Sequence, residues 1–263
     1  MAALGGDLHA ALESVLTGPL APFRGRLCFG PPDAAVLPVH SVPVDALMTP
    51  EHLQQVCGHF DAKHGATPAR VVASIWSKWH FAIVMPAWFI GHVLLGRRLP
   101  MALGALRFDM DGEGRTLGLR LPDGGERIGG AADAERAMSE LMDQHLTPFI
   151  AQLAERTGVT HRVLWSNAGN LFEAFIRRLD ETHPGLDGLA QARRWLETEV
   201  DARGQPNPMF QPVLYLPRAE DLHRMRRICC MRYLVPDRVF CTTCPSPLLE
   251  AENKACKPPE ANP

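Results

Sequence analysis

Four cysteines near the end of the chain have a spacing that suits metal binding. Cys229 and Cys230 are adjacent, and Cys241 and Cys244 follow with two residues between them. A Cys-x2-Cys turn can direct two thiolates at one metal ion, and four thiolates suit either a structural zinc or an iron–sulfur cluster. The sequence therefore predicts a four-thiolate site and leaves the metal open between zinc and a [2Fe–2S] cluster.

The adjacent pair places a condition on this site. Neighbouring residues of a regular strand point to opposite faces, so Cys229 and Cys230 can both bind metal only if the backbone bends or if their sulfurs reach different metal atoms. A two-iron cluster offers two such atoms. A thioredoxin-like dithiol at Cys241 and Cys244 lacks the βαβ context that it would need, and Cys256 is interpreted as a spare thiol.

Composition and charge exclude several classes of protein. The chain has 263 residues, 46% of them hydrophobic, and a formal net charge of −2, which is unlike a general nucleic-acid binder. Residues 1–20 lack the basic start of a secretory signal, so we expect a cytoplasmic protein. The apolar stretch 81–96 is interrupted by Pro86 and His92 and is shorter than the roughly 20 residues of a spanning helix, so we expect at most peripheral membrane contact.

The elements that must position the cysteines are mostly helical. Apolar spacing and capping residues predict helices over 7–16, 49–59, 67–84, 131–156, 160–180 and 186–200, with a kink or restart at Pro86. Alternating apolar and polar residues predict a hairpin from 106–111 and 116–121, and 213–216 reads as extended. The predicted fold is α+β and mainly helical, with a small antiparallel sheet and a C-terminal iron–sulfur-binding segment. We divide it into a body (1–212), the cysteine segment (213–248) and a disordered tail (249–263).

The sequence around the four cysteines resembles that of a known protein family. Residues 226–234, RRICCMRYL, followed by 241–245, CTTCP, are similar to the C-terminal signature of the FhuF-type ferric siderophore reductases. Weaker similarity is found at 75–79, IWSKW, and 165–167, WSN. The resemblance implies that Cys229, Cys230, Cys241 and Cys244 hold one [2Fe–2S] cluster per chain. It also makes the body (1–212) the candidate siderophore-binding region.

The same resemblance implies a function. It indicates a cytoplasmic oxidoreductase near the inner face of the membrane, which passes one electron to siderophore-bound Fe(III), usually of the hydroxamate type, and so releases iron. Hard oxygen donors hold Fe(III) far more strongly than Fe(II), so reduction loosens the metal. No glycine pattern supports a nicotinamide or flavin site, and electrons would come from a ferredoxin-like protein or a flavoprotein. The alternative is a zinc-stabilised module that binds a siderophore or a protein without redox activity.

Other residues are considered for tuning the cluster potential, for metal binding or for ligand contact. Arg227 and Arg232 are expected to raise the cluster potential, because guanidinium groups favour the more negative reduced form. His52, His59 and His64 near Cys57 lack ligand spacing and are interpreted as ordinary histidines. The remaining candidates for ligand contact are aromatic or polar residues for which packing competes with binding, namely Trp76, Trp79, Trp88, Trp165, Asn167 and Asn170.

Overall fold

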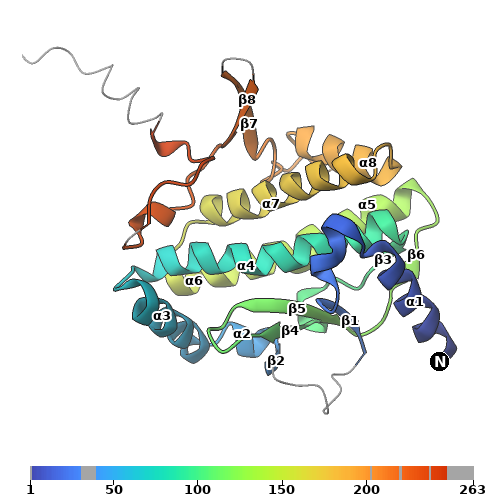
Figure 1. Ribbon diagram of the computed structural model, residues 1–263, viewed down its shortest axis with the longest axis horizontal. Helices are drawn as coiled ribbons and strands as arrows, with labels where there is room; N and C mark the ends of the chain where they lie inside the picture. Colours follow the sequence, from blue (N-terminus) through green and yellow to red (C-terminus); the bar gives the residue numbers. More distant parts are fainter. Residues whose placement is uncertain (1, 31–39, 202, 219–220, 237, 248–263) are drawn as a thin grey trace, which may run out of the picture.

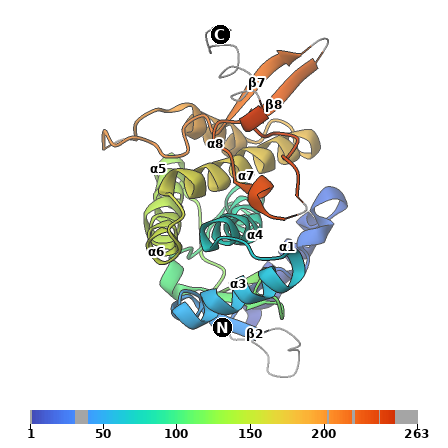
Figure 2. The same ribbon diagram turned by 90° about the vertical axis from the view of Figure 1, so that its left-hand side faces the viewer.

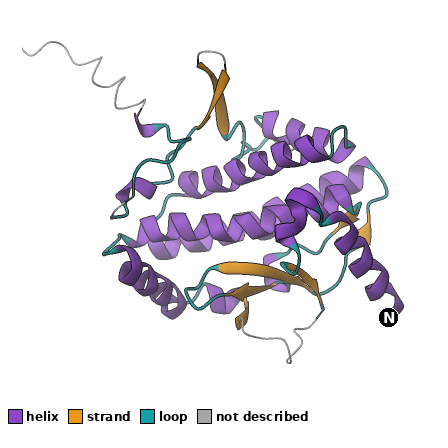
Figure 3. Cartoon of the chain, in the orientation of Figure 1, coloured by secondary structure: helices purple, strands orange, loops and turns teal. Residues whose placement is uncertain are grey.

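The computed structural model describes residues 2–30, 40–201, 203–218, 221–236 and 238–247, so the predicted tail 249–263 lies outside the described residues. Helices dominate, with small sheets at the edges (Figure 3). The α-helices are α1 (Ala2–Val15), α2 (Val44–Leu47), α3 (Pro50–His64), α4 (Ala69–Phe89), α5 (Ala131–Glu140), α6 (Thr147–Thr157), α7 (His161–Thr182) and α8 (Asp187–Glu197). The π-helical turns η2 (Ile90–Leu94) and η4 (Leu141–Leu146) extend α4 and α5, and short 3-10 turns are η1 (Gly18–Phe23), η3 (Leu103–Ala105) and η5 (Arg232–Leu234).

Several helices begin and end where the sequence predicted. The Thr160 hydroxyl accepts a hydrogen bond from the Val163 N–H and caps α7, and Thr49 caps α3 in the same way. Gly158 ends α6 in the left-handed conformation, with φ of 69°. These boundaries follow from local chemistry, which explains why the predicted helices were confirmed, although α3 continues five residues beyond the predicted His59.

The sequence predicted a kink or a restart at Pro86, and the restart was wrong. The helix α4 runs through Pro86 to Phe89 and continues into η2. A proline inside a helix costs about 3 kcal/mol. Most of α4 is buried, because it packs against α7 on one side and β5 on the other (Figure 1), and this burial outweighs the lost hydrogen bond.

A four-stranded sheet covers the other side of α4. Its order is β1 (Leu27–Phe29), β5 (Thr116–Leu121), β4 (Arg107–Met110) and β2 (His40–Pro43). The hairpin β4–β5 confirms the prediction, and Phe108 and Leu119, both 0% exposed, face the core. The expected antiparallel sheet is corrected in one respect, because β1 pairs with β5 in parallel. β1 and β2 lie between residues 17 and 48, where the sequence predicts no strand; only their long-range pairing makes them strands.

Two two-stranded sheets complete the described part of the structure. β3 (Arg97–Arg98) pairs with β6 (Glu126–Arg127), and β7 (Val213–Arg218) pairs with β8 (Asp221–Arg226). The β7–β8 hairpin projects from the helices in Figures 1 and 2, and it leads directly to the four cysteines. Among the described residues, none of the helices combines the length and hydropathy that crossing a bilayer requires.

Candidate metal centre

Within the cysteine segment, residues 226–245 are fixed to the ends of α4 and α7 that lie beside them (Figure 2). The Ser74 hydroxyl of α4 donates to the Cys230 carbonyl at 2.9 Å, and the Ser166 hydroxyl of α7 donates to the Ile228 carbonyl at 3.3 Å. Within the segment, the Arg226 N–H donates to the Thr243 carbonyl at 2.9 Å. These bonds bring the two halves of the cysteine motif together and hold them against the helical body.

The four predicted thiols lie as two pairs. The Sγ atoms of Cys229 and Cys244 are 3.5 Å apart, and the thiols of Cys230 and Cys241 share a hydrogen bond. Two sulfurs bound to one tetrahedral metal at about 2.3 Å would lie about 3.8 Å apart, so Cys229 and Cys244 have nearly the spacing of two ligands of one metal atom. Over the part of the chain that the structure describes, no three metal-binding side chains gather around one point. Two pairs suit a centre with two metal atoms better than a single zinc.

The backbone between the first two cysteines and η5 is bent, as the adjacent pair requires. Met231 has a φ of 60°, in the left-handed region, and its N–H donates to Cys229 Sγ at 3.3 Å. The Arg232 N–H donates to the Cys230 sulfur. Cys229 and Cys230 therefore belong to different pairs, and each sulfur accepts a backbone hydrogen bond that stabilises a thiolate.

Two cations face the Cys230 sulfur. Lys78 Nζ lies 3.4 Å from Cys230 Sγ, and the nearby Arg226 guanidinium belongs to a side chain that is only 3% exposed. The hydrogen bond from Cys241, reinforced by these two cations against the effect of burial, lowers the pKa of Cys230. The same hydrogen bond raises the pKa of Cys241, and burial raises the pKa of Cys229. The surroundings of Cys230 thus favour its thiolate form.

A buried polar network holds Arg226 in this place. Its Nη2 donates to the Asn167 Oδ1 at 2.5 Å, and the Asn167 amide donates to the Ser77 hydroxyl and to the Ser74 carbonyl and hydroxyl. Asn167 is 0% exposed, and Arg226 Nε has no hydrogen-bond partner in the described part of the chain. Asn167 therefore links α4, α7 and the cysteine segment rather than offering itself to a ligand, and its position in an otherwise amphipathic helix was the signal in the sequence.

Gly169 allows the segment before β7 to approach α7. A Cβ added at Gly169 would lie 2.7 Å from Pro212 Cβ, closer than side chains normally come. Pro212 also accepts a hydrogen bond at its carbonyl from the Arg227 N–H, at 3.2 Å. The close packing at Gly169 thus positions the chain that carries Arg227 and the cysteines.

Arg227 and Arg232, which were predicted to raise the cluster potential, are both more exposed than Arg226. Arg227 is exposed and its guanidinium lies over the Phe210 ring, 6.0 Å from the centroid. The half-buried Arg232 contributes its backbone N–H, as described above. Sequence reasoning selected these two residues and missed Lys78 as a cation near the sulfurs, because Lys78 precedes Cys230 by 152 residues.

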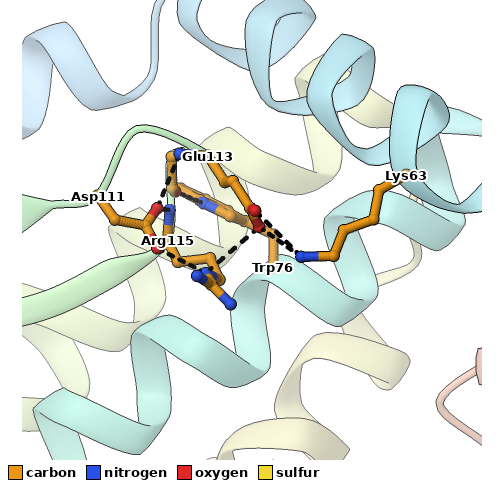
Figure 4. A network of polar contacts seen from close by, with 6 residues as sticks. Lys63, Trp76, Asp111, Glu113 and Arg115 are labelled. Atoms are coloured by element: carbon orange, nitrogen blue, oxygen red, sulfur yellow. Dashed lines mark hydrogen bonds and ion pairs between the residues drawn. The ribbon is translucent and has the colours of Figure 1, made fainter.

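The tryptophans predicted as candidate ligand contacts divide into two groups. Trp76 is 1% exposed and its indole N–H donates to the Gly114 carbonyl at 2.7 Å, beside the ion pairs of Asp111, Glu113, Lys63 and Arg115 (Figure 4). Trp88 is 2% exposed. These two side chains serve packing, whereas Trp79 and Trp165 are half-buried and accessible.

The comparisons with known proteins agree with this centre. Residues 74–222 match the family described as "Ferric iron reductase FhuF-like transporter", and residues 226–245 match the "FhuF 2Fe-2S C-terminal domain". The chain is also 22% identical, over 173 residues, to the ferric siderophore reductase of Escherichia coli (strain K12); the alignment covers 65% of this chain and 64% of that protein, less than two thirds of its length. The C-terminal match supports a [2Fe–2S] cluster rather than zinc, in keeping with the two thiol pairs. Since the first match covers more than half of the chain, the protein belongs to the FhuF-like ferric iron reductase family.

Proposed function

We propose that this protein reduces Fe(III) held by a siderophore to Fe(II), by one electron, and so releases the iron. The observation that carries the proposal is the arrangement of four thiols as two pairs, within a segment that matches a 2Fe–2S domain. The reductase name of the Escherichia coli relative supports the same reaction.

The ligands that we propose are Cys229 and Cys244 for one iron and Cys230 and Cys241 for the other. When bound there, a [2Fe–2S] cluster supplies one-electron redox chemistry. The chain's own part is to present four thiolates, to donate backbone N–H groups to two of them, and to place a cation beside Cys230. Each of these interactions favours negative charge at the site.

Cations near the site should favour the state with the extra electron. Lys78 and Arg226 lie nearest to the sulfurs, and we propose that they do most of this work. Arg227 and Arg232 remain predicted contributors, of smaller effect, since Arg227 is exposed to solvent. No acid–base pair is required, because the substrate iron gains an electron and no proton.

The remaining parts of the proposal rest on the sequence. The electron donor would be a ferredoxin-like protein or a flavoprotein, and the place of action the cytoplasm, near the inner face of the membrane. A siderophore of the hydroxamate type is implied by the family resemblance alone. The division into a body (1–212) and a cysteine segment (213–248) stays a prediction.

Anaerobic purification followed by metal analysis tests the proposal. The protein should be brown, contain two irons and two sulfides per chain as its cofactor requires, and lose visible absorbance on reduction. Mixing the reduced protein with a ferric siderophore should restore the absorbance and produce one Fe(II) per cluster, trapped by a coloured Fe(II) chelator. Colourless protein with one zinc, or reduced protein that no ferric siderophore reoxidises, would contradict the function.

A further inference from the structure

A cavity of about 540 Å³ opens directly beside the cysteine segment. It lies between the first turns of α7, residues 208–212 and the chain that enters the cysteine motif. Nine residues line it, namely His161, Arg162, Trp165, Ser166, Pro208, Phe210, Pro212, Arg227 and Ile228. Ile228 immediately precedes Cys229, and consecutive Cα atoms are about 3.8 Å apart. A molecule in this cavity that contacts Ile228 therefore lies next to a proposed cluster ligand.

The lining has a definite chemistry. Arg162 and Arg227 are both exposed, and none of the nine lining residues carries a carboxylate. The cavity also takes in the first turn of α7, where the helix dipole attracts negative charge. Trp165 and Phe210, both half-buried, add aromatic surface on which a flat or apolar group can pack.

Another cavity on the helical body is placed differently. It measures about 420 Å³ and includes Trp88 and His92, at the far end of α4. Ser74, which bonds the Cys230 carbonyl, precedes Trp88 by 14 residues, or about 21 Å of helix. A substrate held there would be remote from the thiols, whereas the cavity at Ile228 is next to them.

We propose that the cavity between α7 and Ile228 is the docking site of the ferric chelate, and that its two arginines select chelates with net negative charge. This inference rests on the proposed function and names the site and the charge class of its substrate. Iron held by three catecholates forms a trianion, whereas iron held by three hydroxamates forms a neutral complex, so the two classes should bind unequally. A hydroxamate siderophore with free carboxylates would also satisfy the site.

Binding of redox-inert chelates tests the site without electron transfer. The probes are the Ga(III) complexes of a tris-catecholate and of a trihydroxamate, titrated into the oxidised holoprotein by calorimetry. We expect the trianion to bind about ten-fold more tightly than the neutral complex at low salt. This advantage should shrink in about 0.5 M NaCl, where charges on the surface are screened.

Two charge reversals on α7 form a matched pair. Arg162→Glu should weaken binding of the trianion by about ten-fold or more while changing the neutral complex by less than about three-fold. Arg178→Glu alters another exposed arginine of the same helix, 16 residues and about 24 Å further along, and should leave both affinities unchanged. Trp165→Ala should weaken both complexes, because it removes contact surface rather than charge. The visible spectrum of the cluster reports that each variant has folded.

The outcomes separate the site from the reaction. Equal binding of both complexes by the wild type, or wild-type affinity for the trianion in Arg162→Glu, would overturn the charge selection at this cavity. If neither Ga(III) complex binds but ferric chelates still reoxidise the reduced protein, the cavity is wrong and the reductase stands. If both complexes bind as expected but no ferric chelate reoxidises the protein, the cavity stands as a chelate site and the reductase function is wrong.

Discussion

Lys78 offers the sharpest test of the electrostatics at the cluster. Its ammonium lies 3.4 Å from Cys230 Sγ on a half-buried side chain of α4. An added electron on the centre interacts favourably with this charge, so Lys78 should raise the midpoint potential. Replacing it by methionine, which has a similar length and no charge, should make the cluster harder to reduce.

The size of the shift follows from Coulomb's law. Two unit charges 4 Å apart interact by about 4 kcal/mol at an effective dielectric constant of about 20. The added electron resides on the metal atoms beyond the sulfur, and Lys78 is partly solvated. Both effects weaken the interaction, so we expect Lys78 to stabilise the reduced cluster by about 1–2 kcal/mol. Since about 1.4 kcal/mol corresponds to about 59 mV for one electron, Lys78→Met should lower the potential by roughly 40–90 mV.

A redox titration followed by the visible absorbance of the cluster measures this shift. Lys78→Arg keeps the charge and should stay close to wild type. Arg178→Met removes a cation that lies 11 residues, or about 16 Å, along α7 from Asn167. Because this distance exceeds the Debye length of about 8 Å at physiological salt, the substitution should not shift the potential. Arg227→Gln should shift it less than Lys78→Met, because Arg227 is exposed. An unchanged potential in Lys78→Met, or an equal fall in Arg178→Met, would refute the reasoning.

Three further predictions concern the ligands, the acid stability and the packing at α7. Cys241→Ser should lose the visible spectrum and the iron, whereas Cys256→Ser, which lies outside the described residues, should keep both; loss of colour in the second variant would mean that the ligands were wrongly assigned. Burial lowers the pKa of His92 in the folded state to about 4, below its ordinary value of 6.5. As the pH falls below 6.5, the unfolded state therefore binds a proton at this histidine before the folded state does, and the free energy of unfolding decreases. Chemical denaturation should show the wild type losing about 2 kcal/mol more between pH 7 and pH 5 than His92→Gln, and parallel pH curves would contradict this. Gly169→Ala should lower the free energy of unfolding by roughly 1–2 kcal/mol, because the added methyl group would collide with Pro212. The control Gly58→Ala, in an open position of α3, should raise the free energy of unfolding by up to about 1 kcal/mol. A stabilised Gly169→Ala variant would show that the packing at Gly169 is loose.

Local residue chemistry was enough to predict most of the helices and the central hairpin. Thr160 and Thr49 at helix starts, Gly158 at a helix end and the alternation on either side of residues 112–114 act within a few residues of themselves. The predictions that were wrong or incomplete involve partners far along the chain. Pro86 stays helical as a buried residue of α4, a helix that packs against α7 and β5, and residues 27–29 become a strand only through pairing with residues 119–121.

By itself the sequence determined the chemistry of the site, because four cysteines at this spacing provide a thiolate donor set whatever surrounds them. Tertiary structure decided how these thiols pair, which cations approach them and where a substrate has room. Lys78, Asn167 and Arg226 meet at the cysteine segment although they lie on three separate elements, and a distance between side chains so far apart in sequence depends on packing of the whole fold. The donor atoms are thus a local property of the chain, while their charge environment is a property of the folded molecule.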